Sequence, residues 1–193
     1  MEGGRHPQAA LPRVVYSLDE LIRITKFTKK ELQLMYRSFK QECPNGYVEE
    51  DTFRLIFSLF FPYGNVAPYA HYVFRTFDHH KAGAITFKDF VVCVSVLSRG
   101  NLREKLEWAF KLYDLNGDGR VTRKELHEIA AAIHSLVSRK CGEDTRTLTE
   151  HVDRTFAKMD INKDGVITID EFMDSCEKDE TIKESLTIFD TVL

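Results

Sequence analysis

The sequence predicts an all-α protein of four helix–loop–helix repeats, arranged as two paired lobes with short antiparallel β contacts between the paired loops. Two kinds of observation lead to this fold class. A twelve-residue loop rich in oxygen-bearing side chains, Asp114–Glu125, returns as Asp160–Glu171, and two altered copies precede it at 78–89 and 41–52. Helical patterns of apolar residues flank the copies, as expected when each repeat is one supersecondary unit.

The helices follow from their caps and apolar stripes. Thr28-Lys-Lys-Glu31 is a capping box, so a helix is expected to open there. Pro68 suits the first turn of the helix before the second loop, where an N–H has no helical partner. Three further stripes border the two complete loops: Leu102, Leu106, Ala109, Phe110 and Tyr113; Leu126, Ile129, Ile133 and Val137; and Val152, Phe156 and Met159.

Each complete loop places oxygen donors at alternating positions of a tight turn, the pattern of the calcium-binding loop called the EF-hand. Calcium takes about seven oxygens at roughly 2.3–2.6 Å, and the glutamate at position twelve can supply two of them. The glycine at position six permits a positive φ. We therefore expect two Ca²⁺ ions, because a pair of chance acidic turns would not repeat this pattern. The predicted ligands are Asp114, Asn116, Asp118, the Arg120 carbonyl and Glu125 in one loop, and Asp160, Asn162, Asp164, the Val166 carbonyl and Glu171 in the other, with Thr122 and Thr168 acting through water.

The loop at 78–89 keeps the frame of the repeat and loses its ligands. Gly83 and Ile85 hold the turn and the apolar eighth position. His80 and Ala82 replace oxygen donors, and Asp89 is one methylene shorter than glutamate. The adjacent histidines 79 and 80 lack further ligands for a histidine metal site, so a solvated turn is the favoured interpretation.

The loop at 41–52 departs further. Gly46 and Val48 keep the frame, but Gln41, Cys43 and Thr52 cannot form an anionic cage. Pro44 stiffens the turn, and the preceding aromatics are out of step, which predicts an irregular start. Loops of this kind pair at position eight, so Val48 is expected to meet Ile85, and Val121 to meet Ile167. The two altered loops would then be kept for folding.

Composition excludes several other classes. The net charge is −3 among abundant residues of both signs, which gives no nucleic-acid footprint. Four scattered cysteines without a C-x-x-C pair favour free thiols in a reducing compartment. The longest apolar runs are too short for a bilayer span, and the N-terminus lacks a signal-peptide pattern. Glu2 stands where N-myristoylation needs glycine. We expect a soluble intracellular protein. No catalytic motif points to an enzyme.

The chain resembles the neuronal calcium sensors, the recoverin-like family of four-EF-hand proteins. The resemblance runs from about residue 27 to the C-terminus and rests on Glu42–Gly46, Phe60–Gly64, Ser98–Gly100 and Glu104–Asp114. Within this family it is most similar to the Kv-channel-interacting proteins, through Tyr36–Lys40, Tyr69–His71, Asp170–Cys176 and the tail after Lys178. One departure is the second loop, which that branch usually keeps able to hold a metal.

The resemblance implies a cytoplasmic auxiliary subunit of A-type (Shal-class) voltage-gated potassium channels. The N-terminal half would hold the channel's hydrophobic N-terminal segment in an apolar groove, which alters surface expression and inactivation. The membrane would be reached only through that partner, and self-association of the chain is left open. The alternatives are a sensor for another target (a receptor kinase, a cyclase or transcription) and a calcium buffer.

The expected organisation is a variable segment at 1–26, an altered pair at 27–99, a calcium-competent pair at 100–178 and an amphipathic helix at 179–193. The final stripe, Ile182, Leu186 and Phe189, would either cap the C-terminal lobe or occupy its groove as an internal ligand. The segment 11–22 could dock, touch a membrane or cover the protein's own surface. Eight aromatic side chains are each either core or groove: Tyr36, Phe39, Phe57, Phe60, Phe61, Phe74, Phe90 and Trp108.

Overall fold

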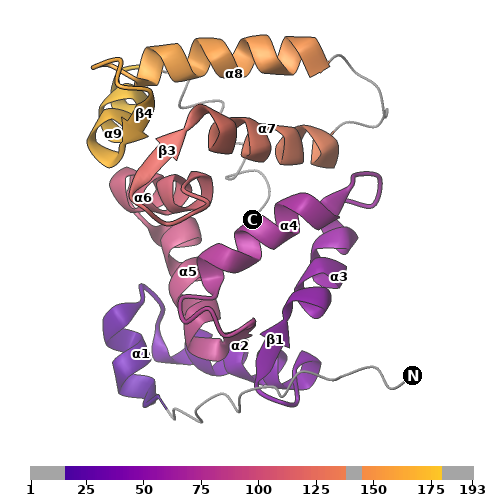
Figure 1. Cartoon of the computed structure of the whole chain (residues 1–193). Helices are drawn as coiled ribbons and strands as arrows, with labels where there is room; N and C mark the ends of the chain where they lie inside the picture. Colours follow the sequence, from indigo (N-terminus) through magenta and orange to yellow (C-terminus); the bar gives the residue numbers. More distant parts are fainter. Residues whose placement is uncertain (1–15, 138–144, 180–193) are drawn as a thin grey trace.

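The computed structural model describes residues 16–137 and 145–179. The N-terminal part contains α1 (Leu18–Ile24), α2 (Lys29–Glu42), β1 (Tyr47–Glu49), α3 (Glu50–Phe60), α4 (Val66–Phe77), β2 (Ala84–Thr86) and α5 (Phe87–Arg99). The C-terminal part contains α6 (Leu102–Tyr113), β3 (Arg120–Thr122), α7 (Arg123–Val137), α8 (Thr145–Met159), β4 (Val166–Thr168) and α9 (Ile169–Lys178). The predicted all-α class is confirmed (Figure 1).

Each helix–loop–helix pair is joined by a two-stranded antiparallel sheet. In the N-terminal pair β1 meets β2, with Val48 opposite Ile85. In the C-terminal pair β3 meets β4, with Val121 opposite Ile167. Both predicted contacts are confirmed, and these four side chains are at most 6% exposed.

Local sequence signals account for the helix starts. Glu31 accepts a hydrogen bond from the Thr28 backbone N–H at 2.7 Å while the Thr28 hydroxyl accepts from the Glu31 N–H, so the predicted capping box is present. Pro68 lies in the first turn of α4. Asn101 caps α6 with Glu104 in the same reciprocal way. The Asn101 cap of α6 stands two residues after α5 ends at Arg99.

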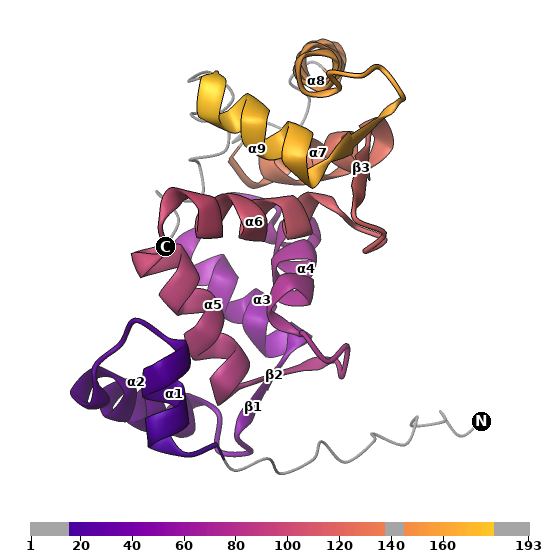
Figure 2. The same cartoon turned by 90° about the vertical axis from the view of Figure 1, so that its left-hand side faces the viewer.

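One apolar core runs through both pairs. It extends from Phe39 in α2 to Cys176 in α9 and includes Trp108 of α6. The turned view shows α6 lying between the helices of the N-terminal pair below it and those of the C-terminal pair above it (Figure 2). The two pairs therefore share a packed boundary, so a movement in one pair bears on the other.

The short helix α1 covers part of the N-terminal pair. Its Leu21 is 5% exposed and packs in a second cluster with Phe27, Leu32 and Val91. Of the alternatives for this segment, the described residues 16–24 show self-covering. Residues 1–15 and the predicted C-terminal stripe (Ile182, Leu186 and Phe189) lie outside the described part of the chain.

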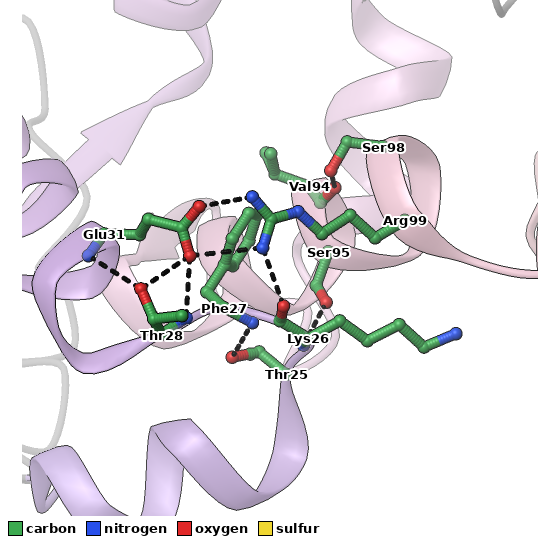
Figure 3. Close-up of polar contacts among 9 residues, drawn as sticks. All are labelled: Thr25, Lys26, Phe27, Thr28, Glu31, Val94, Ser95, Ser98 and Arg99. Atoms are coloured by element: carbon green, nitrogen blue, oxygen red, sulfur yellow. Dashed lines mark hydrogen bonds and ion pairs between the residues drawn. The ribbon is translucent and has the colours of Figure 1, made fainter.

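The segment between α1 and α2 is fastened to the end of α5 (Figure 3). Arg99 forms an ion pair with Glu31, donates to the Lys26 carbonyl at 2.8 Å and lies over the Phe27 ring. The Ser95 hydroxyl accepts from the Lys26 N–H at 2.7 Å. This cluster fixes the angle between α1 and α2.

Three cysteines in the described ranges, Cys43, Cys93 and Cys176, are free and buried. Burial raises the pKa of the Cys93 and Cys176 thiols to about 12, so neither is a reactive thiolate at neutral pH. Across the same ranges, no helix is long and apolar enough to cross a membrane.

Candidate calcium-binding loops

Both complete loops begin at the residue that ends the helix before them. Asp114 is the C-cap of α6, and its N–H donates to the Phe110 carbonyl. Asp160 follows α8 directly, with its N–H donating to the Phe156 carbonyl at 2.9 Å. The first predicted ligand of each loop is therefore carried on a helix end held by the core.

The aspartate at position one curls the loop around its own carboxylate. In the third loop, Asp114 accepts from the backbone N–H groups of Gly117 at 2.8 Å, Asp118 at 3.1 Å and Gly119 at 2.8 Å. In the fourth loop, the Asp160 oxygens each accept a backbone N–H at 3.1 Å, one from position five and one from position six. Positions one to six are thus bent back toward position one.

The glutamate at position twelve closes each loop from the other side. One Glu125 oxygen accepts from the Asn116 N–H at 3.2 Å, and the other accepts from the Thr122 N–H at 2.8 Å. Glu171 makes the same contacts to Asn162 at 3.2 Å and Thr168 at 3.0 Å. The last predicted ligand therefore already reaches across to position three.

These amide contacts favour the ionised form of Glu171. The Thr168 backbone hydrogen bond is the largest cause that lowers the pKa of Glu171 below its ordinary value. Glu125 lies in the equivalent place and is 7% exposed. A glutamate at position twelve is the ligand that supplies two oxygens to Ca²⁺ in such a loop.

The backbone conformations match the tight turn that the motif requires. Gly119 and Gly165 at position six have φ of 81° and 87°. Position four is left-handed as well, at Gly117 and at Lys163, where φ is 61°. A side chain is rare in this region, so Lys163 marks a turn held by its hydrogen bonds.

The donor set fits calcium by its chemistry. In residues 16–137 and 145–179, no three Asp, Glu, His or Cys side chains converge as a ready-made metal cluster. The three predicted ligand carboxylates of each loop stand at positions one, five and twelve, and the other predicted ligands are an Asn amide oxygen and a main-chain carbonyl. All are hard oxygen donors without sulfur or nitrogen, which suits Ca²⁺ rather than a transition metal. When bound, the ion would supply charge compensation among the three carboxylates of its loop.

The second loop has the same backbone and lacks the donors. Asp78 accepts from the N–H groups of Ala82 at 2.9 Å and Gly83 at 2.7 Å, as position one does in the complete loops. Asp89 replaces glutamate; it closes a capping box with Thr86, and one of its oxygens lies 3.9 Å from the His79 Nδ1. One His79 ring nitrogen lies 2.9 Å from the Phe77 carbonyl. The predicted decay of this site is thus a loss of side chains on an intact turn.

The first loop differs in its backbone too. Helix α2 continues to Glu42, so position one, Gln41, lies inside the helix. Gly46 keeps a φ of 88°, but Pro44 stands at position four, where a left-handed φ is excluded. The Lys40 ammonium donates to the Pro44 carbonyl at 2.6 Å. The expected irregular start is therefore a helix that runs on into the loop.

The aromatic residues divide between core and surface. Phe39, Phe57, Phe74 and Trp108 are buried, and Phe61 and Phe90 are partly buried against the core. Tyr36 is 49% exposed. The Phe60 side chain lies outside the described part. The aromatics proposed for a groove are thus mostly structural, and the Tyr36 ring is the exposed exception among those described.

Exposed apolar surface lies instead mainly on aliphatic residues of α3. Leu55, Ile56 and Leu59 are 68%, 39% and 78% exposed, and Tyr63 just after the helix is 79% exposed. We call these four residues the α3 patch. Spacing is the available signal: Leu59 follows Leu55 by four positions and Ile56 by three, so it neighbours both on the helix surface, away from the core-facing Phe53 and Phe57.

Comparison with known protein families agrees with this geometry. Residues 103–177 match a family model described as an EF-hand domain pair. Residues 70–97 match a second model, also described as an EF-hand domain pair. The chain therefore contains EF-hand domains and is a calcium sensor or binder.

Proposed function

We propose that this chain is a calcium sensor that serves as a cytoplasmic auxiliary subunit of A-type (Shal-class) voltage-gated potassium channels. It would bind the hydrophobic N-terminal segment of the channel on the apolar surface of its N-terminal pair. Binding would promote surface delivery of the channel and alter its inactivation. The membrane would be reached through the channel alone.

The α3 patch is the observation that carries this proposal. Surface positions of a helix are usually polar, whereas this helix offers Leu55 and Leu59 to solvent at 68% and 78% exposure. Its opposite face, with Phe53 and Phe57, packs on Phe74 of α4. Because α3 is apolar on both faces and only one of them packs on the core, its other apolar face is available to a partner.

An apolar partner helix suits this surface chemically. Amphipathic helices bind apolar surfaces of helical proteins through anchors at i, i+3, i+4 and i+7. The patch spans i, i+1 and i+4 on α3, so it matches one or two turns of such a helix. The resemblance to Kv-channel-interacting proteins supplies the particular partner.

Calorimetric titration with the N-terminal cytoplasmic peptide of an A-type channel tests the proposal. We expect saturable binding, with the difference between calcium and chelator buffers giving the dependence on the ion. Leu59→Gln should weaken binding at least about tenfold, since a central apolar anchor contributes more than 1 kcal/mol. Leu102→Gln, at an exposed leucine of α6, is the matched control. No binding in either buffer would contradict the proposal.

A calcium buffer is the rival that the same patch argues against. Buffer proteins of this fold open little when calcium binds and have no need of exposed apolar surface. An apolar dye therefore separates the two: a sensor gives a calcium-dependent rise in dye fluorescence, and a buffer gives none.

A further inference from the structure

Helix α4 lies against the third repeat along its whole length. It leads into the second loop, which has lost its ligands, yet it packs on α6 and α7 as well as on α3. Figure 1 shows α4 between α3 and α7. Three polar or steric contacts join it to the third repeat, one at each end and one between.

The first contact touches the third calcium loop itself. Arg75, in the last turn of α4, donates from its guanidinium to the Leu115 carbonyl at 2.6 Å. Leu115 is position two of that loop, between the predicted ligands Asp114 and Asn116. The end of α4 is thereby attached to the ion-binding backbone.

The second contact reaches α7. Tyr72 in α4 lies near Glu128 of α7: burial first, and then the charge of Glu128, raise the pKa of this tyrosine. Glu128 is the sixth residue of α7, three positions after the closing ligand Glu125. The middle of α4 therefore packs beside the first half of α7.

The third contact lies at the opposite end of α7. The Asn65 N–H donates to the Ser135 carbonyl at 2.9 Å. A Cβ on Gly64 would lie 1.9 Å from the Leu136 carbonyl oxygen, so only glycine fits this approach. These residues directly follow Tyr63 of the α3 patch, so the turn at 64–65 connects α7 to that patch.

Helix α7 is suited to carry a movement between these points. Its third residue is Glu125, which bonds to Asn116 across the loop, so the orientation of α7 depends on how that carboxylate is held. From residue 123 to residue 135 the helix spans about 18 Å at about 1.5 Å per residue. A rotation of about 10° at the loop moves the far end by about 3 Å over this length. That is enough to break the Asn65–Ser135 hydrogen bond.

We propose that α4 and the turn at 64–65 couple the calcium state of the third loop to the α3 patch. In the arrangement described here Glu125 reaches across its loop to the Asn116 N–H, so the contacts of α7 to Tyr72 and Gly64 accompany an orientation in which position twelve faces position three. Weakening them should lower the calcium affinity of the third loop and leave the fourth unchanged. Because coupling free energies are reciprocal, the same change should reduce the response of α3 to calcium.

The test isolates each loop with a second substitution. In a Glu171→Gln background, where the third loop alone binds, Gly64→Ala should weaken calcium affinity at least about fivefold, a typical coupling. In a Glu125→Gln background, where the fourth loop alone binds, it should change nothing. Hydrogen exchange supplies the second readout: calcium should change protection of the α3 amides in the Glu171→Gln protein and lose that effect once Gly64→Ala is added.

A gentler pair of variants keeps the proposal open to refutation if Gly64→Ala does not fold. Tyr72→Phe removes one hydroxyl without changing charge and should weaken the third loop in the same direction. Tyr36→Phe, at an exposed tyrosine of α2, is the matched control and should have no effect. The proposal would be overturned if Gly64→Ala or Tyr72→Phe lowered the calcium affinity of both loops equally. It would also be overturned if Tyr72→Phe left the calcium affinity of the third loop unchanged.

Discussion

The two helix–loop–helix pairs have the same frame, and only the C-terminal pair has a full set of oxygen donors. Position six is left-handed in all four loops, at Gly46, Gly83, Gly119 and Gly165. Position eight is buried and paired across a short sheet in both pairs. The requirements of folding therefore reside in the turn and the eighth position, whereas ion binding resides in positions one, three, five and twelve.

The two altered loops show that ligand loss has two forms. The second loop retains the wrapped backbone, with Asp78 still accepting from the Gly83 N–H. The backbone of the first loop does not curl around position one, because α2 continues to Glu42 and Pro44 stands at position four. The second loop is therefore repairable by side-chain changes, and the first is not.

The largest expected effect is loss of one ion when a closing ligand is neutralised. Glu125→Gln should abolish calcium binding at the third loop and Glu171→Gln at the fourth, since each removes the bidentate carboxylate. The Gly119 and Gly165 amide resonances, followed during calcium titration, report the loops separately. An unchanged calcium response at Gly119 in Glu125→Gln would contradict the ligand assignment.

Repair of the second loop should add a third ion. His80→Asp, Ala82→Asp and Asp89→Glu together restore positions three, five and twelve on the intact turn. The matched control applies Gln41→Asp, Cys43→Asp and Thr52→Glu to the first loop, where position one lies in a helix. We expect calorimetry to count one extra ion for the first design and none for the second. An extra ion in both would show that backbone frame does not limit binding.

Position eight should matter equally for stability in both pairs. Ile85 and Ile167 are 1% and 0% exposed, so Ile→Ala at either site should cost about 2–5 kcal/mol in the free energy of unfolding. Urea unfolding in chelator measures this without the contribution of bound calcium. Ile24→Ala, at a 45% exposed site, should change it by less than about 0.5 kcal/mol. A negligible cost at Ile85 would show that the altered loop is not kept for folding.

The smallest expected effect concerns the ion pair between Glu31 of α2 and Arg99 of α5. The hydrogen bond from Arg99 holds the pKa of Glu31 at about 2, below its ordinary value of 4.5. The folded-state pKa is depressed, so the stabilisation is complete above pH 4.5 and is lost as the pH falls toward 2. The free energy of unfolding of Glu31→Gln should therefore fall below that of the parent chain by the largest amount above pH 4.5. Arg99→Gln should show the same pH dependence; a difference that grows on acidification would contradict the pairing.

The repeat frame was predictable because each part of it is a local signal. Glycine at position six, an apolar residue at position eight and the Thr28–Glu31 capping box all act within a few residues. The predicted ligands likewise fall on two curled loops, since Asp114 and Asp160 each organise their own backbone. Local signals of this kind can be recognised in the sequence without knowledge of the tertiary fold.

The contacts between repeats were not predictable in this way. Arg75 reaches Leu115 across forty positions, and nothing near Gly64 in the sequence marks its fit against Leu136. The surface aliphatics of α3 were hidden for a related reason. The run at 57–61 is apolar on several sides, so the sequence does not indicate that Phe57 faces the core while Leu59 is exposed.

Calcium titration of the full chain by calorimetry tests the central contrast most directly. We predict two ions per chain, both bound by the C-terminal pair. A third ion, or calcium bound by a Glu125→Gln/Glu171→Gln double variant, would place a working site in the N-terminal pair and contradict it.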